Sequence, residues 1–347
     1  MATVGLLYNL GKYDPPEEGE PPDIHAELDG EGTVMAIAEA LRWGGHEVVF
    51  IEGNEDAYQK LREAKMDIAF NICEGLRGES RESQIPAILE MLGIPYTGSG
   101  VLTLALSLDK PMAKKVFAYH GVPTPRFRVF DTGDEITSEG LRFPLFVKPA
   151  HEGSSMGVSP SSVVRDETEL RQQVDYVRRF YRQAALVEEF LDGREFTVGI
   201  LGNRDPYVFP IREIKFNKVP AEHGCVYSRQ FKVEWDDEEY YACPAPVTDE
   251  EAAAIRDVAL RAYKALNCYD VGRVDVRFDR DGVPNVLEIN PLPGLTPGFS
   301  DLCKVAEAAG MSYEYLVCAI LDTALERYGL THLRSRAVEF GALSRTA

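Results

Sequence analysis

The segment 272–291 carries the residues whose types and spacing are best suited to chemistry. It reads GRVDVRFDRDGVPNVLEINP, and alternating apolar and polar positions flank Asp281-Gly282, a strong signal for a two-residue hairpin turn. Such a turn would place Asp275 opposite Glu288, with Asn290 on the same face of the return strand. Directly opposed carboxylates repel each other, and carboxylate and amide oxygens are ligands that Mg²⁺ prefers. The hairpin therefore predicts a magnesium site, and a solvated acidic face is the alternative.

A second set of residues suits the binding of a polyphosphate. Lys148 ends an apolar strand, and the Gly/Ser segment 153–157 (GSSMG) follows it closely. Small residues let backbone N–H groups approach phosphate oxygens, and an ammonium group supplies a compact positive charge. The segment does not follow the GxxxxGK[ST] pattern of Walker-type loops. A plain turn between strands is the alternative, and Lys110, at the start of a helix, is either a second phosphate ligand or a surface charge.

The segment 186–191 (LVEEFL) offers groups for a nucleoside. Strand backbone commonly makes hydrogen bonds to adenine, and a carboxylate can bind ribose hydroxyls. Glu188, Glu189 and Glu195 are the candidate carboxylates. Acidic residues at an exposed sheet edge are the alternative for each of them.

The composition limits the classes of partner. The chain has 347 residues and a formal net charge of −19, whereas nucleic-acid-binding proteins normally carry a basic surface. The amino terminus has no basic region before an apolar stretch, and no run approaches the length of a membrane span. The six cysteines have no CxxC spacing. We therefore expect a cytoplasmic protein with reduced thiols and with neither a membrane nor a nucleic-acid partner.

Strands and helices must alternate to position these residues. In the first hundred residues they do so at lengths that indicate an α/β fold with a parallel, doubly wound sheet. The acidic, proline-containing stretch Gly11–Gly32 is predicted to be a long irregular loop, and residues 212–241 are polar and poor in helix signals. The predicted strands are 3–7, 48–51, 68–72, 145–148, 185–190 and 195–200, and the predicted helices are 33–41, 56–65, 83–92, a stretch that ends at 120, 167–181, 249–266 and 312–328.

Together these segments resemble the ATP-grasp superfamily and, within it, the D-alanine–D-alanine ligases. The resemblance implies an amino-terminal α/β domain (1–107), followed by an α+β ATP-grasp fold with a central subdomain (108–190), a carboxy-terminal subdomain (191–330) and a tail (331–347). The motifs that carry it are FNICEGLRGESRESQIPAILEMLGIPYTGSG (70–100), LDK (108–110), VKPAHEGSSMGV (147–158), VEEFLDGREFTV (187–198), GRVDVRF (272–278) and LEINPLPGLTP (287–297).

The resemblance also implies a reaction and its partners. A substrate carboxylate attacks the γ-phosphate of ATP to give an acylphosphate, and an amine then attacks the acylphosphate to form a peptide bond. ADP and phosphate are released. The implied partners are ATP, two Mg²⁺ ions with Mn²⁺ as the alternative metal, an amino acid or short peptide, and a second copy of the chain in a homodimer.

The family's site residues map onto this chain one by one. The nucleotide-binding residues correspond to Lys110, Lys148, Gly153, Ser154, Ser155, Gly157, Glu188, Glu189, Phe190, Leu191, Glu195, Lys232 and Leu287. The metal ligands correspond to Asp275, Glu288 and Asn290, in agreement with the hairpin register. The groups that orient the amino acid and stabilise the tetrahedral intermediate correspond to Arg273, Ser154 and Gly294.

The positions that recognise the amino acids depart from the family pattern. The family's amino-terminal Gly-Gly, Ser and Glu signature is absent, and Glu27 is the candidate for the missing Glu. A His-Gly pair becomes Glu74-Gly75, a tyrosine becomes Val233, and a Ser-Leu pair becomes Phe299-Ser300. Three hypotheses follow: a D-alanine–D-alanine ligase of peptidoglycan biosynthesis, an ATP-grasp ligase for a different amino acid or peptide, and a nucleotide-binding regulatory protein without turnover.

Overall fold

A three-stranded parallel sheet forms the amino-terminal part of the chain in this computed structural model, which describes residues 1–11, 21, 23–24, 26–220, 224–235 and 238–336. The strand order is β2-β1-β3, and both pairings are parallel, which confirms the predicted parallel sheet. Val4 and Leu6 of the central strand are completely buried, as is typical of parallel strands covered on both faces. The elements are β1 (Thr3–Tyr8), α1 (Glu31–Trp43), β2 (Glu47–Glu52), α2 (Ala57–Glu63), β3 (Ile68–Asn71) and α3 (Gln84–Leu92).

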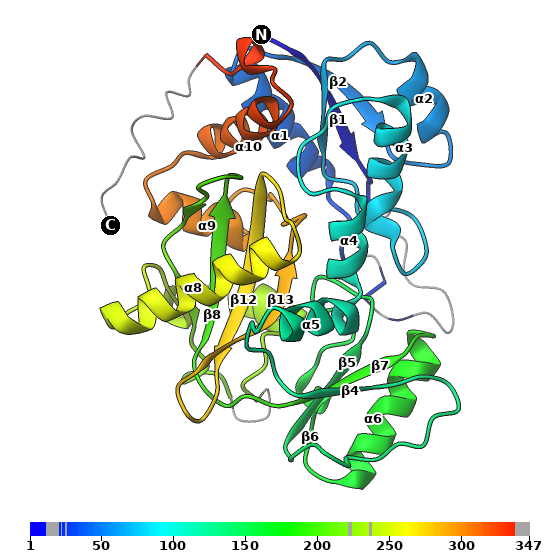
Figure 1. Ribbon diagram of the computed structural model, residues 1–347, viewed down its shortest axis with the longest axis vertical. Helices are drawn as coiled ribbons and strands as arrows, with labels where there is room; N and C mark the ends of the chain where they lie inside the picture. Colours follow the sequence, from blue (N-terminus) through cyan, green and yellow to red (C-terminus); the bar gives the residue numbers. More distant parts are fainter. Residues whose placement is uncertain (12–20, 22, 25, 221–223, 236–237, 337–347) are drawn as a thin grey trace.

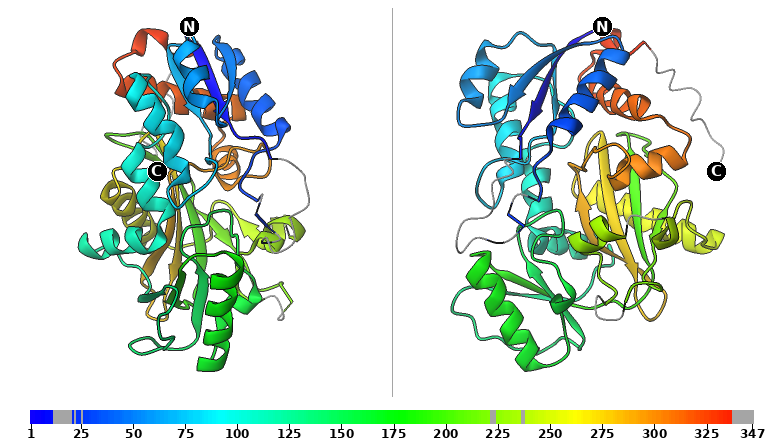
Figure 2. Two further views of the ribbon diagram at one scale, coloured as in Figure 1. Left: turned by 90° about the vertical axis from the view of Figure 1, so that its right-hand side faces the viewer. Right: turned by 180° about the vertical axis from the view of Figure 1, so that it is seen from behind.

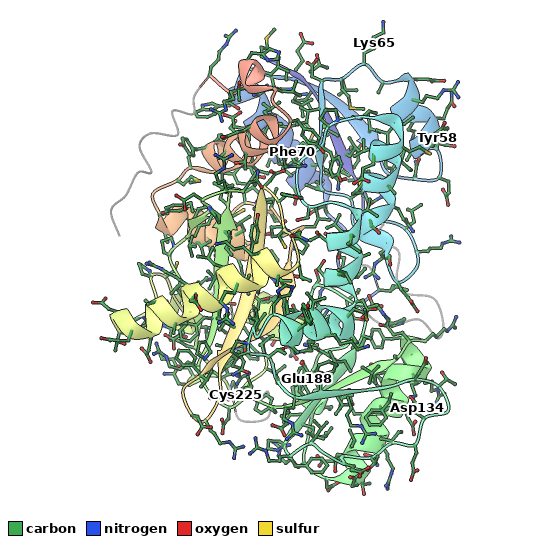
Figure 3. All side chains as sticks on the ribbon, viewed as in Figure 1. Tyr58, Lys65, Phe70, Asp134, Glu188 and Cys225 are labelled. Atoms are coloured by element: carbon green, nitrogen blue, oxygen red, sulfur yellow. The ribbon has the colours of Figure 1, made fainter. Side chains whose placement is uncertain are left out.

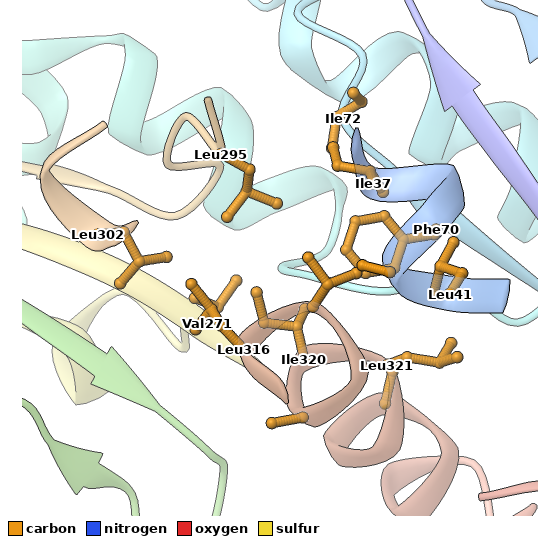
Figure 4. Packing of buried hydrophobic residues seen from close by; sticks show 14 of the residues in the cluster. Ile37, Leu41, Phe70, Ile72, Val271, Leu295, Leu302, Leu316, Ile320 and Leu321 are labelled. Carbon is orange, nitrogen blue, oxygen red and sulfur yellow. The ribbon is translucent and has the colours of Figure 1, made fainter. Parts of the chain in front are cut away.

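Helix α10 (Tyr313–Arg327) brings the carboxy-terminal part of the chain back to this sheet. It packs against α1, which presents Val34, Ile37 and Leu41 at helical spacing. Figure 4 shows this core, in which side chains of α1 and α10 meet Phe70 of β3. Burial of each large apolar side chain contributes about 1.5–3 kcal/mol, so this interface ties the two ends of the chain together. The domain boundaries stay a prediction.

A four-stranded antiparallel sheet lies at the opposite end of the molecule (Figures 1 and 2). Its order is β4-β7-β5-β6, and α6 packs on one face through Leu170, Val174 and Val177. Strand β4 is absent from the predicted set, because its short sequence FRVF follows two prolines and has no strong alternation. The elements are β4 (Phe127–Phe130), β5 (Leu145–Pro149), β6 (Val163–Val164), α6 (Glu167–Phe180) and β7 (Ala185–Glu189).

A six-stranded antiparallel sheet occupies the middle of the molecule. Its order is β11-β10-β8-β12-β13, with β9 beside β8. Helices α8 and α9 pack against it and contribute to different core clusters, α8 with β12 and β13 and α9 with β8 and α10. The stretch predicted to be poor in helix holds β10, β11 and the short helix α7. The elements are β8 (Glu195–Leu201), β9 (Tyr207–Val208), β10 (Arg212–Ile214), α7 (Arg229–Glu234), β11 (Tyr241–Ala242), α8 (Asp249–Ala265), β12 (Val271–Phe278), β13 (Pro284–Asn290) and α9 (Asp301–Ala308).

Two helices, not one, connect the parallel sheet to the four-stranded sheet. They are α4 (Val101–Leu108) and α5 (Lys110–Tyr119). The helical stretch predicted to end at 120 is interrupted at Asp109, whose side chain accepts a hydrogen bond from the Met112 N–H and so caps α5. Pro111 in the first turn of α5 needs no N–H there. The interruption places Lys110 at the start of a new helix, as expected.

The hairpin β12–β13 has the predicted pairing at the carboxylates but a different turn. Asp275 pairs with Glu288, and Arg273 pairs with Asn290. The connection spans residues 279–283, so the prediction of a two-residue turn is wrong. A β-bulge compensates for the longer connection: Val276 pairs with Val286, which leaves Leu287 as the extra residue. Between the turn and the bulge, each residue therefore pairs one position away from its predicted partner. The predicted pairing is restored at Glu288.

Short 3₁₀ helices lie outside the elements named above. Within the described residues, no helix is both long enough and apolar enough to cross a membrane. The 3₁₀ helices span Arg81–Ser83, Pro160–Ser162, Glu238–Tyr240 and Thr331–Leu333.

Candidate active site

A cleft lies between the four-stranded and the six-stranded sheets. Strands β5, β7, β8, β12 and β13, the loop after Lys148 and helix α7 all contribute to it. The predicted site residues that line it are Lys110, Lys148, Ser155, Glu188, Glu189, Phe190, Leu191, Glu195, Lys232, Asp275, Leu287 and Glu288.

The other predicted site residues lie outside this lining. Gly153 and Asn290 line a smaller second cavity, which also touches Lys110 and Glu288. Ser154, Gly157, Arg273 and Gly294 line neither space. Arg273 is nonetheless bound to Asp275, and a side chain at Gly294 would lie 3.0 Å from Ser300 Oγ.

Two aromatic rings line one part of the cleft. The rings of Phe146 and Phe190 stack with their centres 6.2 Å apart and an angle of 25° between their planes. Leu287, the extra residue of the bulge, faces this space together with Glu288. Strict alternation predicts Leu287 on the opposite face, and the bulge is the reason that this prediction is wrong. An apolar slot between strands suits a planar base.

A buried carboxylate between two lysines follows this apolar slot. Glu188 lies 2.9 Å from Lys148 Nζ and 2.9 Å from Lys114 Nζ, between α5 and the four-stranded sheet (Figure 3). Burial alone would raise the pKa of Glu188, but Lys114 and Lys148 hold it below its ordinary value. Burial lowers the pKa of Lys114 to about 8, against the opposing effect of Glu188. Sequence reasoning missed Lys114, because its position shows no pattern that distinguishes it from a surface lysine.

The carboxylate predicted to bind ribose is also paired. Arg277 Nη1 donates to Glu195 Oε2 at 2.9 Å, and the Arg277 guanidinium lies 4.7 Å from the centre of the Phe190 ring. Burial raises the pKa of Glu195 to about 7, although Arg277 opposes the rise. Glu189 instead forms an ion pair with Arg142, in which Glu189 Oε2 lies 3.1 Å from Arg142 Nη2. Arg277 was not among the predicted site residues, although alternation along β12 puts it on the same face as Asp275.

The inner end of the cleft gathers the predicted metal ligands. Asp275 accepts hydrogen bonds from Thr197 Oγ1 at 2.6 Å, from Arg273 Nη2 at 2.9 Å and from Asn290 Nδ2 at 3.3 Å. Glu288 lies 3.7 Å from Lys110 Nζ. Arg273 and Lys110 therefore already neutralise the facing carboxylates, so the repulsion argument alone does not require a metal ion. The donor set of two carboxylates and one amide beside phosphate-binding lysines still fits Mg²⁺.

Four cations surround Glu288. Burial alone would raise its pKa, but Lys110, Lys148, Arg273 and Lys232 lower it to about 2. Burial and Arg273 lower the pKa of Lys232, whose Nζ lies 4.6 Å from the centre of the Tyr227 ring. Positive charge thus converges on one end of the cleft, where a polyphosphate would need it.

The Gly153–Gly157 loop has the backbone conformation of an anion-binding turn. Ser154 and Ser155 have φ angles of 46° and 59°, which are rare for residues with side chains. Gly157 has a φ of 72°, and a Cβ there would lie 2.5 Å from Pro149 Cγ. Consecutive N–H groups in such turns form concave sites for anions.

The stretch predicted to be a long loop supplies carboxylates to this glycine loop. Glu27 Oε1 accepts from the Gly153 N–H at 2.5 Å, and Asp23 Oδ2 accepts from the Gly157 N–H at 2.8 Å. Glu27 also binds Arg81, at 2.6 Å. Residues 12–20, 22 and 25 of the stretch lie outside the described part of the chain. Sequence reasoning named Glu27 only as a candidate and gave no contact for it.

Glu74, Val233 and Phe299, which depart from the family pattern, line neither the cleft nor the second cavity. Glu74 is next to Glu27, Asp29 and Glu82, and burial together with Glu82 raises its pKa well above the ordinary value. The side chains of Val233 on α7 and of Phe299 before α9 are 64% and 47% exposed.

Comparisons with known proteins extend the resemblance seen in the motifs. Residues 116–322 match the family model described as D-ala D-ala ligase C-terminus. The chain is 38% identical to uncharacterized protein y4sG of Sinorhizobium fredii, over 94% of this chain and 95% of that protein. It is 35% identical to the D-alanine–D-alanine ligase of Bordetella petrii, over 93% and 92% of the two chains.

A solved structure gives a similar result. The D-alanine–D-alanine ligase from Bacillus anthracis, complexed with ATP, superposes with a TM-score of 0.71 and 27% sequence identity, and the match covers 95% of this chain and 99% of that chain. The similarity in sequence and in fold therefore covers nearly the whole chain.

Proposed function

Because this chain belongs to the D-alanine–D-alanine ligase family of ATP-grasp enzymes, we propose that its cleft joins the carboxylate of one D-alanine to the amine of another. The family makes it an ATP-dependent ligase that forms a peptide bond. The choice of D-alanine is the proposed part. The choice of D-alanine is supported by the relatives that carry that name, and the ligase reaction is supported by the convergence of Lys110, Lys148 and Glu288 in one cleft.

The side chains divide the work of the reaction between the two ends of the cleft. The apolar slot at Phe146 and Phe190 takes the adenine, and Glu195 takes the ribose. Lys110 and Lys148 bind the phosphates and neutralise their charge, which is the main requirement of phosphoryl transfer. The Gly153–Gly157 loop, whose Gly153 and Gly157 N–H groups donate to Glu27 and Asp23, covers the phosphates. Arg273 orients the substrate carboxylate for attack on the γ-phosphorus.

Asp275, Glu288 and Asn290 are the residues that would hold Mg²⁺, or Mn²⁺ in its place. A divalent ion at this position neutralises phosphate charge and holds the phosphate chain in one orientation. Arg273 and Lys110, which now neutralise the two carboxylates, would then be free to interact with the substrate and the phosphates. A homodimer and a cytoplasmic location remain predictions of the family resemblance and the composition.

The altered residues favour a second candidate substrate. Glu74, Val233 and Phe299 replace residues that the family uses around its amino acids, which favours a different amino acid or a short peptide. A role in peptidoglycan biosynthesis follows only if the substrate is D-alanine. The complete set of phosphate-binding and metal-binding side chains in one cleft favours an enzyme over a regulatory protein without turnover.

Phosphate release from ATP with Mg²⁺ tests this proposal across D-amino acids, L-amino acids and short peptides. D-Alanine alone is expected to stimulate release at least tenfold and to yield the dipeptide. Stimulation by another compound, with none by D-alanine, would favour the second candidate. If no compound stimulates release while ATP still binds, the proposal of a ligase acting on amino acids or peptides is wrong.

A further inference from the structure

Arg277 of β12 is a buried arginine in the lining of the cleft. Its side chain is only 5% exposed. The antiparallel pairing of β8 and β12 sets it directly opposite Glu195, and its Nη1 donates to Glu195 Oε2 at 2.9 Å. The same guanidinium donates to two backbone carbonyls, from Nε to Gly193 at 3.1 Å and from Nη1 to Cys225 at 2.9 Å. One side chain therefore connects β12, the turn before β8 and the segment before α7.

The guanidinium of Arg277 also lies against two aromatic rings. Its Cζ is 4.7 Å from the centre of the Phe190 ring and 5.2 Å from the centre of the Phe216 ring. Phe190 is one wall of the apolar slot, so Arg277 joins this slot to the carboxylate of Glu195. Its Nη2 has no hydrogen-bond partner in the part of the chain that the structure describes. A buried donor without a partner costs stability, so this position of Arg277 requires an explanation other than stability.

Glu195 depends on Arg277 for its ion pair. Glu195 is buried, and among the described residues Arg277 is the only one whose side chain forms a hydrogen bond or an ion pair with it. A buried carboxylate that loses its countercharge is strongly destabilised. Arg277 binds Oε2 of Glu195, and within the same residues Oε1 accepts no hydrogen bond, so Oε1 is left to accept from a ligand in the cleft. Arg277 thus keeps this carboxylate both charged and oriented.

We propose that Arg277 is a positioning residue that orients Glu195 toward the ribose hydroxyls, and that it thereby makes the cleft select nucleotides with a complete ribose. The inference rests on the proposed placement of the ribose at Glu195 and adds a residue that determines specificity. Ribose hydroxyls donate hydrogen bonds, and such a bond is about twice as strong when its acceptor is charged. The carbonyls of Gly193 and Cys225 hold the guanidinium in place, so the direction of the carboxylate is fixed before a nucleotide binds.

Calorimetry of the full chain with ADP, 2′-deoxy-ADP and 3′-deoxy-ADP, each with Mg²⁺, tests the proposal. The unchanged chain should bind ADP about tenfold or more tightly than at least one of the two analogues, as expected for a hydrogen bond to a charged acceptor. Arg277→Met keeps an unbranched side chain between the rings but removes the charge and the hydrogen bonds. It should weaken ADP binding by about tenfold and binding of the disfavoured analogue by less than about threefold, so that most of the ribose preference is lost.

Three further variants separate this role from a structural one. Glu195→Gln should lose the same ribose preference, and combining it with Arg277→Met should cause little further loss, because both residues act through one carboxylate. Arg277→Lys keeps the charge without the planar fork and should restore part of the preference. Arg280→Met removes an exposed arginine from the turn of the same hairpin and should bind all three nucleotides as the unchanged chain does.

The proposal is overturned if Arg277→Met keeps the ribose preference, or if it weakens ADP and both analogues equally, which is the result of a purely structural role. If Arg277→Met does not fold, an undiminished preference in Arg277→Lys overturns the proposal instead. It also fails if the unchanged chain has no ribose preference. These measurements need no turnover, so phosphate release with D-alanine tests the ligase reaction independently of them.

Discussion

The charged neighbours of Glu288 determine its protonation. Four cations converge on it and lower its pKa to about 2, although it also faces Asp275 across the hairpin. A phosphate chain entering the cleft would compete with Glu288 for these cations, unless a divalent ion bridges the carboxylate and the phosphates. This competition gives the proposed metal site a measurable consequence.

Glu288→Gln is expected to reduce ATP-dependent phosphate release at least a hundredfold and to raise the Mg²⁺ concentration needed for half-maximal release. Loss of one negative charge beside the phosphates should leave metal-free ATP binding unchanged or tighter. The melting temperature should fall by several degrees, because the amide keeps the shape of the side chain but removes the charge that the surrounding cations favour. Phosphate release titrated with Mg²⁺ measures the effect.

Asp281→Asn is the control for this variant, because Asp281 is an exposed carboxylate in the turn of the same hairpin. Full turnover in Glu288→Gln, with an unchanged Mg²⁺ requirement, would contradict the metal-site assignment. An equal loss in Asp281→Asn would attribute the effect to the hairpin rather than to Glu288.

Individual charged residues were the least predictable part of the site. Alternation along β12 and β13 placed Asp275 opposite Glu288, because period 2 is a property of any strand. Lys114 and Arg81 were missed, since one sequence does not show which charged side chains become buried. Arg81 and Glu27 are 54 positions apart, and only the folded chain brings them together.

Elements were predicted well where local pattern determined them and poorly where tertiary contacts did. The strands of the parallel sheet and helices α6, α8 and α10 were found close to their observed bounds. The bulge at Leu287 was not found, because an extra residue compensated by a longer turn leaves the pattern of alternation almost unchanged. For the same reason the carboxylate pair was predicted correctly with the wrong turn.

A contact between Asp23 and the Gly153–Gly157 loop predicts how this loop is ordered. Asp23 accepts from both the Gly157 N–H and the Tyr181 hydroxyl, each at 2.8 Å. Asp23→Ala removes both bonds, so the glycine loop should lose part of its fixed conformation. We expect faster hydrogen exchange across residues 153–158 and a KM for ATP that rises by up to about tenfold to a hundredfold, the limit set by bonds of about 1.5–3 kcal/mol that involve a charged acceptor.

Asp175→Ala is the control for this experiment, because Asp175 is an exposed carboxylate on α6, whose side chain is 69% exposed. It should leave both the exchange and the KM unchanged. If Asp23→Ala also leaves both unchanged, the segment only covers the loop and does not order its backbone.

At the scale of the whole molecule, both ends of the described chain meet at one buried histidine. His46 follows α1 and is 4% exposed. Its Nδ1 accepts from the Ala2 N–H at 3.2 Å, and its Nε2 lies 2.9 Å from Ser335 Oγ. Because Nδ1 is an acceptor, the proton of the neutral ring is on Nε2 and is donated to Ser335. This arrangement requires a neutral imidazole.

The neutral ring makes stability depend on pH. Burial, with a contribution from the amino terminus, lowers the pKa of His46 to about 4, whereas a histidine in the unfolded chain titrates near 6.5. As the pH falls below about 6.5, the unfolded chain takes up this proton before the folded chain does. The stability contribution of His46 is therefore complete above about pH 6.5 and is lost as the pH approaches 4, by about 2–3 kcal/mol.

His46→Gln should remove this part of the pH dependence. At pH 7.5 the variant is expected to melt at a lower temperature than the unchanged chain, because Gln does not reproduce both hydrogen bonds. The difference in melting temperature should shrink by pH 5, because the unchanged chain then loses the stability contribution of its neutral histidine. Comparing the two proteins at each pH cancels the titration of all other groups. His120→Gln, which changes an exposed histidine, is the control and is measured at the same pH values. A gap between the His46 variant and the unchanged chain that stays constant toward pH 5 would mean that folding does not lower the pKa of His46, and a gap that widens would mean that the folded protein favours the charged ring. Either result would contradict the neutral imidazole between the two ends of the chain.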